Sequence, residues 1–259
     1  MQRSVLVAAT LVLTTIMAVP AGAERLVTSI SRHQVLVNSS FTGTQIVLFG
    51  TIEPDSPTVR LRPPYDLVVT ISGPRETMVT RRKERVFVIW ANVASRTFVN
   101  VPSYLGILAN RPVAQITNVE TLRRLQLGLN YVLLPQQIGQ DIADVVRDDP
   151  LRVNFIRLKQ EHQLYLEQAN GVTFLTPTVF RAEIPVPAQA PFGNYDVNVK
   201  LFSGGNMAAQ AASAYEVVKV GFEQFVATAA REHSILYGIA AVMMAMFTGW
   251  FASVVFRKD

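Results

Sequence analysis

The 259-residue chain contains no cysteine and only three histidines. The absence of cysteine excludes disulfides, thiolate metal sites and thiol redox chemistry, so an exported domain would have to be stabilised by packing alone. The histidines, His33, His162 and His233, are far apart in the sequence, and none has a second ligand at a spacing typical of a metal site. We therefore expect no metal and no cofactor.

Recognisable catalytic motifs are also absent from the sequence. There is no nucleophile elbow, no phosphate-binding loop and no glycine pattern of a dinucleotide site. The pair Asp148-Asp149 precedes Pro150, and acids followed by proline are typical of a helix start. We expect His162 to be packed on the apolar face of that helix. The prediction is a protein that is not an enzyme, with an envelope enzyme lacking a recognisable motif as an alternative.

Charge is sparse, with 17% charged residues and a formal net charge of +5. The densest basic run consists of Arg81, Arg82, Lys83 and Arg85. We expect residues 81–84 to form the solvated tip of a hairpin between strands at 77–80 and 85–90. Contact with lipid headgroups or with an acidic partner loop is the alternative. Nucleic acid is not expected as a partner, because the domain is predicted to be exported.

Long hydrophobic runs occur only at the two ends of the chain. Residues 5–19 would reach about 22 Å as a helix, too short to span a bilayer comfortably. With Arg3 before them and Ala21 and Ala23 after, they predict a signal peptide, residues 1–23, with an uncleaved anchor as the alternative. Residues 234–256 contain no formal charge and are long enough to predict one transmembrane helix.

The two hydrophobic runs together predict a topology. Removal of the signal leaves residue 24 onward on the export side, and Arg257 and Lys258 then lie in the cytoplasm, as the positive-inside rule prefers. The expected order is an exported domain at 24–220, a juxtamembrane helix at 221–233, the span at 234–256 and a cytoplasmic tail at 257–259. The expected location is the inner membrane, with the bulk of the chain in the periplasm.

Small residues recur every four positions along the predicted span, at Ala241, Ala245, Gly249 and Ser253. Such a stripe lets another helix approach closely, so that packing and weak hydrogen bonds hold the two together in lipid. We therefore predict an interface with a second copy of the chain or with another membrane protein. Chance spacing is the alternative, because small residues are common in membrane helices.

The exported part has a β pattern from residue 25 to about 101 and again after Gly171. Short runs of β-branched and apolar residues are separated by turn signals, which predicts an immunoglobulin-like β-sandwich. The expected strands lie at 34–38, 44–52, 66–72, 77–80, 85–90, 96–101, 178–186, 193–202 and 207–220. Gly50 could mark a bulge. Tyr195 lies two residues before the core position Val197, as does the tyrosine of an immunoglobulin strand F, and is predicted to form a structural corner.

The middle of the chain has a helical period and predicts an insertion near 104–170. Thr117 and Glu120 have the spacing of a capping box. A short helix is expected at 138–147, and a longer amphipathic helix is expected to begin at Pro150 and to end at Asn170-Gly171. Two separate domains are the alternative to a sandwich with an insertion. The fold class is therefore mainly β with an α-helical insertion, followed by one transmembrane helix.

Several segments resemble a family of alphaproteobacterial single-span membrane proteins of similar length and unassigned function. They are TLRRLQLGL at 121–129, TVFRAEIPVPAQAPFGNYDV at 178–197 and GFEQFVATAAREHSILYGIAAV at 221–242. Members are often encoded beside a sulfite/sulfonate-type anion exporter. The resemblance implies an accessory role in transport and supplies no catalytic residues. The expected function is a membrane-anchored periplasmic accessory or interaction protein, with an extracytoplasmic ligand sensor as the alternative.

Overall fold

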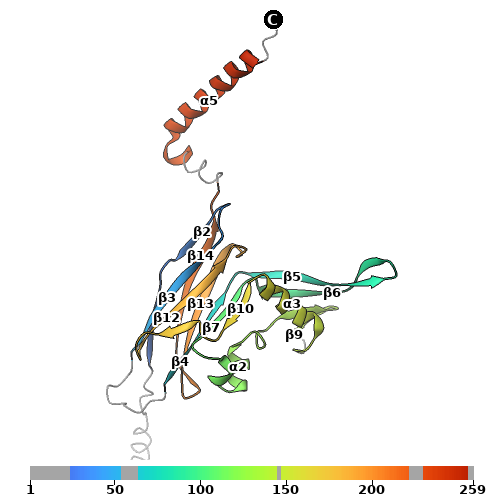
Figure 1. Ribbon diagram of the computed structural model, residues 1–259, viewed down its shortest axis with the longest axis vertical. Helices are drawn as coiled ribbons and strands as arrows, with labels where there is room; N and C mark the ends of the chain where they lie inside the picture. Colours follow the sequence, from blue (N-terminus) through green and yellow to red (C-terminus); the bar gives the residue numbers. More distant parts are fainter. Residues whose placement is uncertain (1–23, 54–63, 145–146, 222–229, 256–259) are drawn as a thin grey trace, which may run out of the picture.

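The computed structural model describes residues 24–53, 64–144, 147–221 and 230–255 (Figure 1). The predicted signal peptide at 1–23, residues 222–229 of the predicted juxtamembrane helix and the predicted tail at 257–259 lie outside the described residues. The described chain is mostly β, with three sheets and one long apolar helix at the C-terminal end. The predicted fold class is therefore confirmed at this level.

Two sheets form a sandwich. Sheet I has the order β1 (Arg25–Ile30), β3 (Gly43–Glu53), β12 (Val179–Pro187), β11 (Val172–Phe174). Sheet II has the order β10 (Tyr165–Gln168), β7 (Leu105–Ala109), β4 (Tyr65–Ser72), β13 (Gly193–Ser203), β14 (Asn206–Lys219), β2 (Gln34–Val37). The order β1-β3-β12-β11 in sheet I faces β4-β13-β14 of sheet II across a shared hydrophobic core.

Alternation along the strands fills the core between these two sheets. In β13 the side chains of Tyr195, Val197 and Val199 are buried, whereas Asp196 and Asn198 between them are exposed. This is the pattern of a strand with one face on a core. The alternation predicted for 193–202 and the turn predicted at 203–206 are both confirmed, because Ser203 pairs with Asn206.

Gly50 has a packing role in sheet I. The register of β3 runs without a shift on both sides, so the suggested bulge is absent from this strand. A Cβ atom at this position would lie 2.2 Å from the ring of Phe180, which is fully buried. The glycine therefore leaves the space that the Phe180 ring occupies.

A second lobe packs on the other face of sheet II. It contains sheet III, with the order β5 (Arg75–Val86), β6 (Ile89–Pro102), β8 (Pro135–Ile138), β9 (Asp141–Asp144), together with the 3₁₀ turn η1 (Val113–Gln115) and the helices α2 (Val119–Leu125) and α3 (Pro150–Glu161). Its core joins Phe98, Leu122 and Phe155 to Leu105 and Ile107 of β7. Every residue of β7 is buried, because the strand has a core on each face.

The predicted insertion at 104–170 contains η1, α2 and α3. Two strands in this range, β7 and β10, nevertheless belong to sheet II, and they pair in parallel. The long hairpin β5–β6, which precedes this range, pairs with β8. The second lobe is therefore assembled from residues 75–102 and 113–161.

Local predictions in the second lobe were wrong at several points. The helix expected at 138–147 is replaced by the hairpin β8–β9, whose turn contains Gly139 with φ of +65°. The cap of α2 is Asn118, whose side chain accepts a hydrogen bond from the Thr121 amide at 2.8 Å. Thr117 instead donates its hydroxyl to the Gly205 carbonyl at 2.7 Å.

The helix α3 begins as predicted but ends earlier. Asp149 caps it by accepting hydrogen bonds from the Leu151 and Arg152 amides at 3.0 and 3.1 Å. Its last residue is Glu161, and β10 follows where the sequence predicted more helix. The apolar positions after Glu161 belong to a strand that is parallel to β7, so the helical spacing there was a coincidence.

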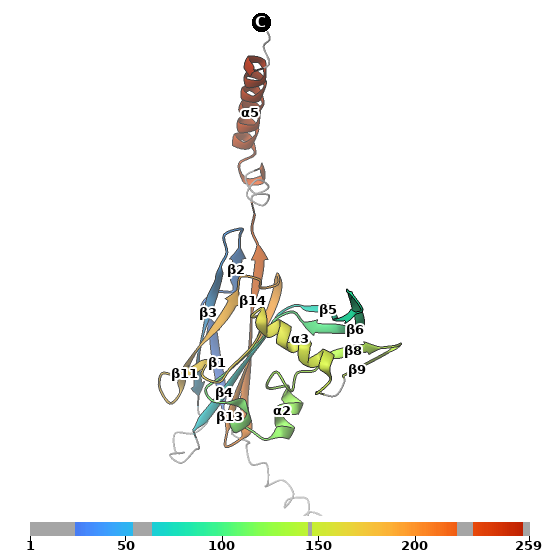
Figure 2. The ribbon, with the colours of Figure 1, turned by 45° about the vertical axis from the view of Figure 1, so that its right-hand side comes forward.

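The helix α5 (Ser234–Val255) follows β14 in the sequence. Figure 2 shows sheets I and II as the body of the molecule, with α2, α3 and the β5–β6 hairpin on one side. The window 234–253 has mean hydropathy 1.8, and none of it is buried in the described chain. A helix of this length and composition suits a bilayer.

Candidate functional site

No group of three or more His, Asp or Glu side chains could hold a metal ion within the described ranges. His33 lies between β1 and β2, with its Nδ1 atom 3.4 Å from the Ala214 carbonyl oxygen. His162 is exposed at the C-cap of α3, so its predicted packing on an apolar face was wrong. His233 is exposed just before α5. The three side chains come from different regions of the fold and form no common site.

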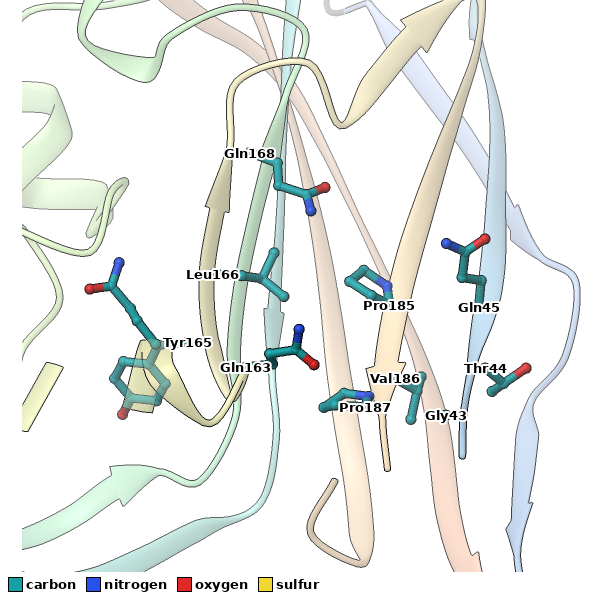
Figure 3. Close-up of a pocket in the computed structure, with 11 residues that line it drawn as sticks. Gly43, Thr44, Gln45, Gln163, Tyr165, Leu166, Gln168, Pro185, Val186 and Pro187 are labelled. Carbon is teal, nitrogen blue, oxygen red and sulfur yellow. The ribbon is translucent and has the colours of Figure 1, made fainter. Parts of the chain in front are cut away.

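A cavity of about 490 Å³ lies where β3 and β12 of sheet I approach β10 and the end of α3 (Figure 3). Every side chain that lines it is uncharged, and four glutamines contribute polar groups: Gln45, Gln160, Gln163 and Gln168. Tyr165 points its ring away from Pro185 and Pro187 and donates its hydroxyl to the Pro102 carbonyl at 2.7 Å. The cavity offers amide hydrogen bonds to a neutral polar molecule.

A second cavity of about 390 Å³ borders an ion pair between the buried Asp66 and the partly exposed Arg111. Asp66 is buried at the start of β4, and its carboxylate accepts hydrogen bonds from Asn110 at 3.0 Å and from Arg111. Asn110 also accepts from the Leu67 amide through its side chain at 2.9 Å. These contacts occupy the carboxylate and fix the start of β4 to the chain after β7, so the cluster is structural.

Tyr195 is a fully buried residue of β13 in the core between the two sheets of the sandwich. Its hydroxyl donates to the Pro191 carbonyl, four residues upstream, at 2.7 Å. Its ring stacks on Tyr215 of β14 with centroids 4.9 Å apart, and Tyr104 lies at 5.6 Å. Burial raises the pKa of the Tyr195 phenol above its ordinary value. The hydrogen bond has the direction expected of a tyrosine corner.

Arg152 is a buried cation whose burial the sequence did not indicate. Its side chain is 2% exposed, and Nη2 donates to the Val132 carbonyl at 2.8 Å while Nη1 lies 3.4 Å from the Asp144 carboxylate. Desolvation lowers the pKa of this guanidinium, and Asp144 opposes that shift. Arg152 therefore links α3 to the β8–β9 hairpin. Its position beside Leu151 on the helix gave no signal of this role.

The basic run lies on strand β5, so the expectation that it forms the tip of a hairpin was wrong. The turn between β5 and β6 is formed by Phe87 and Val88. Figure 1 shows this end of the hairpin extending away from the sandwich, past α3 and β9. The residues of the hairpin tip, defined here as residues 87–90, are highly exposed: Phe87 94%, Val88 81%, Ile89 68% and Trp90 70%.

Strand alternation places three basic side chains on one face of the hairpin, called here the cation face: Arg81, Lys83 and Arg85. Arg85 pairs in register with Trp90, so the indole shares this face. None of the three cations joins an ion pair in the part of the chain that the structure describes. On the opposite face Arg82 Nε lies 2.8 Å from Glu84 Oε1.

The stripe of small residues lies along α5, with Ala241, Ala245, Gly249 and Ser253 all exposed. No atom lies within 4 Å of a Cβ built on Gly249, apart from its own helix and neighbours. Thr248 donates its hydroxyl to the Met244 carbonyl at 2.7 Å. The stripe is therefore free of contacts with the described part of the β domain.

Comparison with known proteins identifies the family. No curated protein matches the chain. A solved structure similar to it is the N-terminal domain of the Streptococcus gordonii adhesin Sgo0707, with 8% identity and a TM-score of 0.28. That match covers 75% of this chain and 32% of the other. The profile of a family described as "Putative transmembrane protein (Alph_Pro_TM)" matches residues 25–258, and the chain therefore belongs to this family of transmembrane proteins.

Proposed function

We propose that this protein is a membrane-anchored periplasmic accessory protein that assists an inner-membrane anion transporter of the sulfite/sulfonate type. The observation that carries the membrane part is α5, an apolar helix of 22 residues with none of its spanning window buried in the chain. The transporter rests on the family resemblance and on the stripe of small residues. The protein's role is then to bind a membrane partner, without chemistry of its own.

The orientation in the proposal follows from charge. Arg257 and Lys258 follow the span directly, and basic residues next to a span favour the cytoplasmic side. Residues 1–23 have the composition of a signal peptide, which would direct the β domain to the periplasm. The corner at Tyr195 and the strand order of sheets I and II support assigning this domain to the immunoglobulin-like sandwiches.

The stripe on α5 is the proposed contact with the partner. Small residues four positions apart allow a second helix to approach, and their replacement by leucine would obstruct it. Ala245→Leu with Gly249→Leu should reduce cross-linking of the full-length protein to its partner in native membranes. Both changes raise apolarity, so insertion of the helix should be unaffected.

The matched control replaces large residues off the stripe, Met244→Leu with Phe251→Leu. These variants should cross-link as the wild type does. If the stripe and control variants behave alike, the span is an anchor without a specific partner. Identification of the cross-linked protein distinguishes a transporter from a second copy of the chain.

The uncharged cavity favours a second candidate, an extracytoplasmic ligand-binding protein. Its four glutamine side chains could hydrogen-bond a neutral polar solute between the two sheets. Binding of such a solute to the purified full-length protein, and its loss in Gln45→Ala with Gln163→Ala, would support this role. No stabilisation of the protein across a panel of neutral polar solutes would argue against it.

A further inference from the structure

We propose that the tip of the β5–β6 hairpin inserts into the interface of the bilayer that α5 spans, with Arg81, Lys83 and Arg85 contacting anionic lipid headgroups. The inference rests on the membrane anchoring in the proposed function and is independent of any transporter. It adds a second membrane contact, made by the β domain itself.

The first support is the exposure of the tip. Two aliphatic and two aromatic side chains lie together at the end of the hairpin, each between 68% and 94% exposed. Single exposed apolar residues are ordinary, but a contiguous apolar group rimmed by polar residues marks an interaction surface.

The second support is the backbone at Phe87, whose φ is +56°. Glycine and asparagine adopt this left-handed conformation readily, whereas a phenylalanine there is strained. When only the first residue of a two-residue hairpin turn has positive φ, as here, glycine is the favoured residue at that position. Phe87 therefore strains the backbone of the turn. A contact made by its ring outside the hairpin would explain why a phenylalanine stands there.

The third support is the distance of the basic residues from the apolar tip along the hairpin. A strand rises about 3.3 Å per residue, so Arg85 lies about 7 Å behind Phe87 and Lys83 about 13 Å behind it. The headgroup layer between hydrocarbon and water is about 5 to 8 Å thick. When Phe87 reaches the acyl boundary, Arg85 is at the depth of the phosphates and Lys83 is just outside. Trp90, on the same face as Arg85, is a residue type enriched in this layer.

The small area of the tip and the charge beside it favour a bilayer over a protein as the partner. Four side chains supply at most on the order of 600 Å² of surface, less than the roughly 800 Å² that each partner contributes to a stable protein interface. A bilayer needs no complementary pocket, because it accepts an apolar tip of any shape. The unpaired charges on the cation face complement anionic lipids.

The hairpin carries its tip away from the domain. Strand β5 has 12 residues, which corresponds to about 40 Å of strand. Figure 1 shows the end of the hairpin projecting from the sandwich, so the tip can meet a surface that the sandwich itself does not touch.

The test uses the full-length protein with Trp250→Phe. The chain has two tryptophans, so Trp90 is then the only one. The protein is reconstituted in vesicles of phosphatidylcholine with phosphatidylglycerol, and flotation verifies incorporation. We expect Trp90 emission at shorter wavelength than in water, with quenching by lipids brominated near the top of the acyl chains. High salt should weaken both effects.

Two variants separate the charges from the apolar tip. Arg81→Gln with Lys83→Gln and Arg85→Gln should lower the bound-to-free ratio of the tip on the order of 100-fold, at about fivefold per charge. Phe87→Gly should also reduce quenching, because glycine suits a first turn position with positive φ. The matched control, Arg123→Gln with Arg124→Gln and Arg157→Gln, removes three exposed charges elsewhere and should quench like the parent.

Three outcomes would overturn the proposal. One is a Trp90 spectrum in anionic vesicles that matches water and shows no quenching. Another is quenching that is the same in the charge variant and its control. The third is shielding of Trp90 in native membranes but not in pure lipid, which would make the occupant a protein. Each outcome leaves the stripe experiment on α5 intact, whereas failure of flotation would contradict the anchor itself.

Discussion

Hairpins β13–β14 and β5–β6 are similar in length, with strands of 11 and 14 residues in the first and 12 and 14 in the second. Each contains register shifts. The first lies in the middle of sheet II and buries alternate side chains of β13 between two sheets, whereas the second exposes both faces over its distal half. Similar local structure therefore serves two different purposes.

The turns of the two hairpins also differ, in the type of residue that has a positive φ. Gly204 and Gly205 close the buried hairpin with φ of +57° and +85°, which glycine adopts without strain. Phe87 takes φ of +56° in the exposed one. The buried hairpin is optimised for folding, while the exposed hairpin keeps an unfavourable residue at its tip. The proposed contact of the hairpin tip with the membrane would account for this difference.

The largest expected effect comes from the corner in the buried hairpin. Tyr195→Ala should lower the free energy of unfolding by about 3 to 5 kcal/mol, because it empties a large buried site and removes the hydrogen bond to Pro191. Tyr195→Phe should cost only about 1 kcal/mol. Urea unfolding of the full-length protein in detergent measures both.

Truncation of a side chain in the exposed hairpin should have little effect on the unfolding free energy. Ile89→Ala should change the unfolding free energy by less than about 0.5 kcal/mol, since surface substitutions rarely do more. Equal losses for Tyr195→Ala and Ile89→Ala would remove the distinction between the two hairpins.

A smaller effect of opposite sign is expected at Tyr215, which pairs with Tyr195 in register. The Tyr215 hydroxyl is buried and has no hydrogen-bond partner in the described chain. Tyr215→Phe should therefore raise the unfolding free energy, by about 1 to 2 kcal/mol, because an unsatisfied buried group is removed. A loss of stability in this variant would indicate that the hydroxyl is satisfied, for instance by an ordered water.

The same variant should change the response to alkaline pH. Burial raises the pKa of four phenols above their ordinary value near 10: Tyr104, Tyr165, Tyr195 and Tyr215. Their stabilisation is complete below pH 10 and is lost above it, because only the unfolded state then releases these protons, at up to about 1.4 kcal/mol per pH unit for each tyrosine. Lys159 and Lys200, whose pKa burial lowers, act in the opposite direction. Tyr215→Phe should flatten the fall in stability above pH 10.

The last comparison concerns the two turns. Gly205→Ala should destabilise the protein by about 1 kcal/mol, because alanine is strained at φ of +85°. Phe87→Gly should be neutral or should stabilise by a few tenths of a kcal/mol, since the strain there is relieved. Thermal unfolding of the two variants under the same conditions checks the signs. Losses of equal size would contradict the strain inferred at Phe87.

Strand patterns with one buried face could be predicted from the sequence, as β13 shows. The turn at 203–206, the start of α3 at Pro150 and the apolar helix at 234–256 were equally clear, because their signals are local. Elements that depend on distant partners could not be read in this way. The hairpin β8–β9 forms because Gln136 and Gln137 pair with Phe98 and Thr97 of β6, some 40 positions earlier, which overrides the helical spacing of 138–147.

The hairpin tip was missed for a different reason. A charged run beside an apolar run normally predicts a turn followed by a strand, and Phe87 is not a residue expected at positive φ. The sequence therefore located the basic residues but reversed the order, placing the charges at the tip and the apolar residues in the strand. The chemistry of this surface was visible in the sequence, whereas its geometry required the fold.

The most direct test of the account is the position of the β domain relative to the membrane. The chain has no cysteine, so Lys219→Cys, exposed at the end of β14, and Lys258→Cys each provide a unique thiol. In intact spheroplasts a membrane-impermeant maleimide should label the cysteine at 219, and should label the one at 258 only after permeabilisation. Labelling of both before permeabilisation, or of 258 alone, would contradict a periplasmic domain anchored by α5.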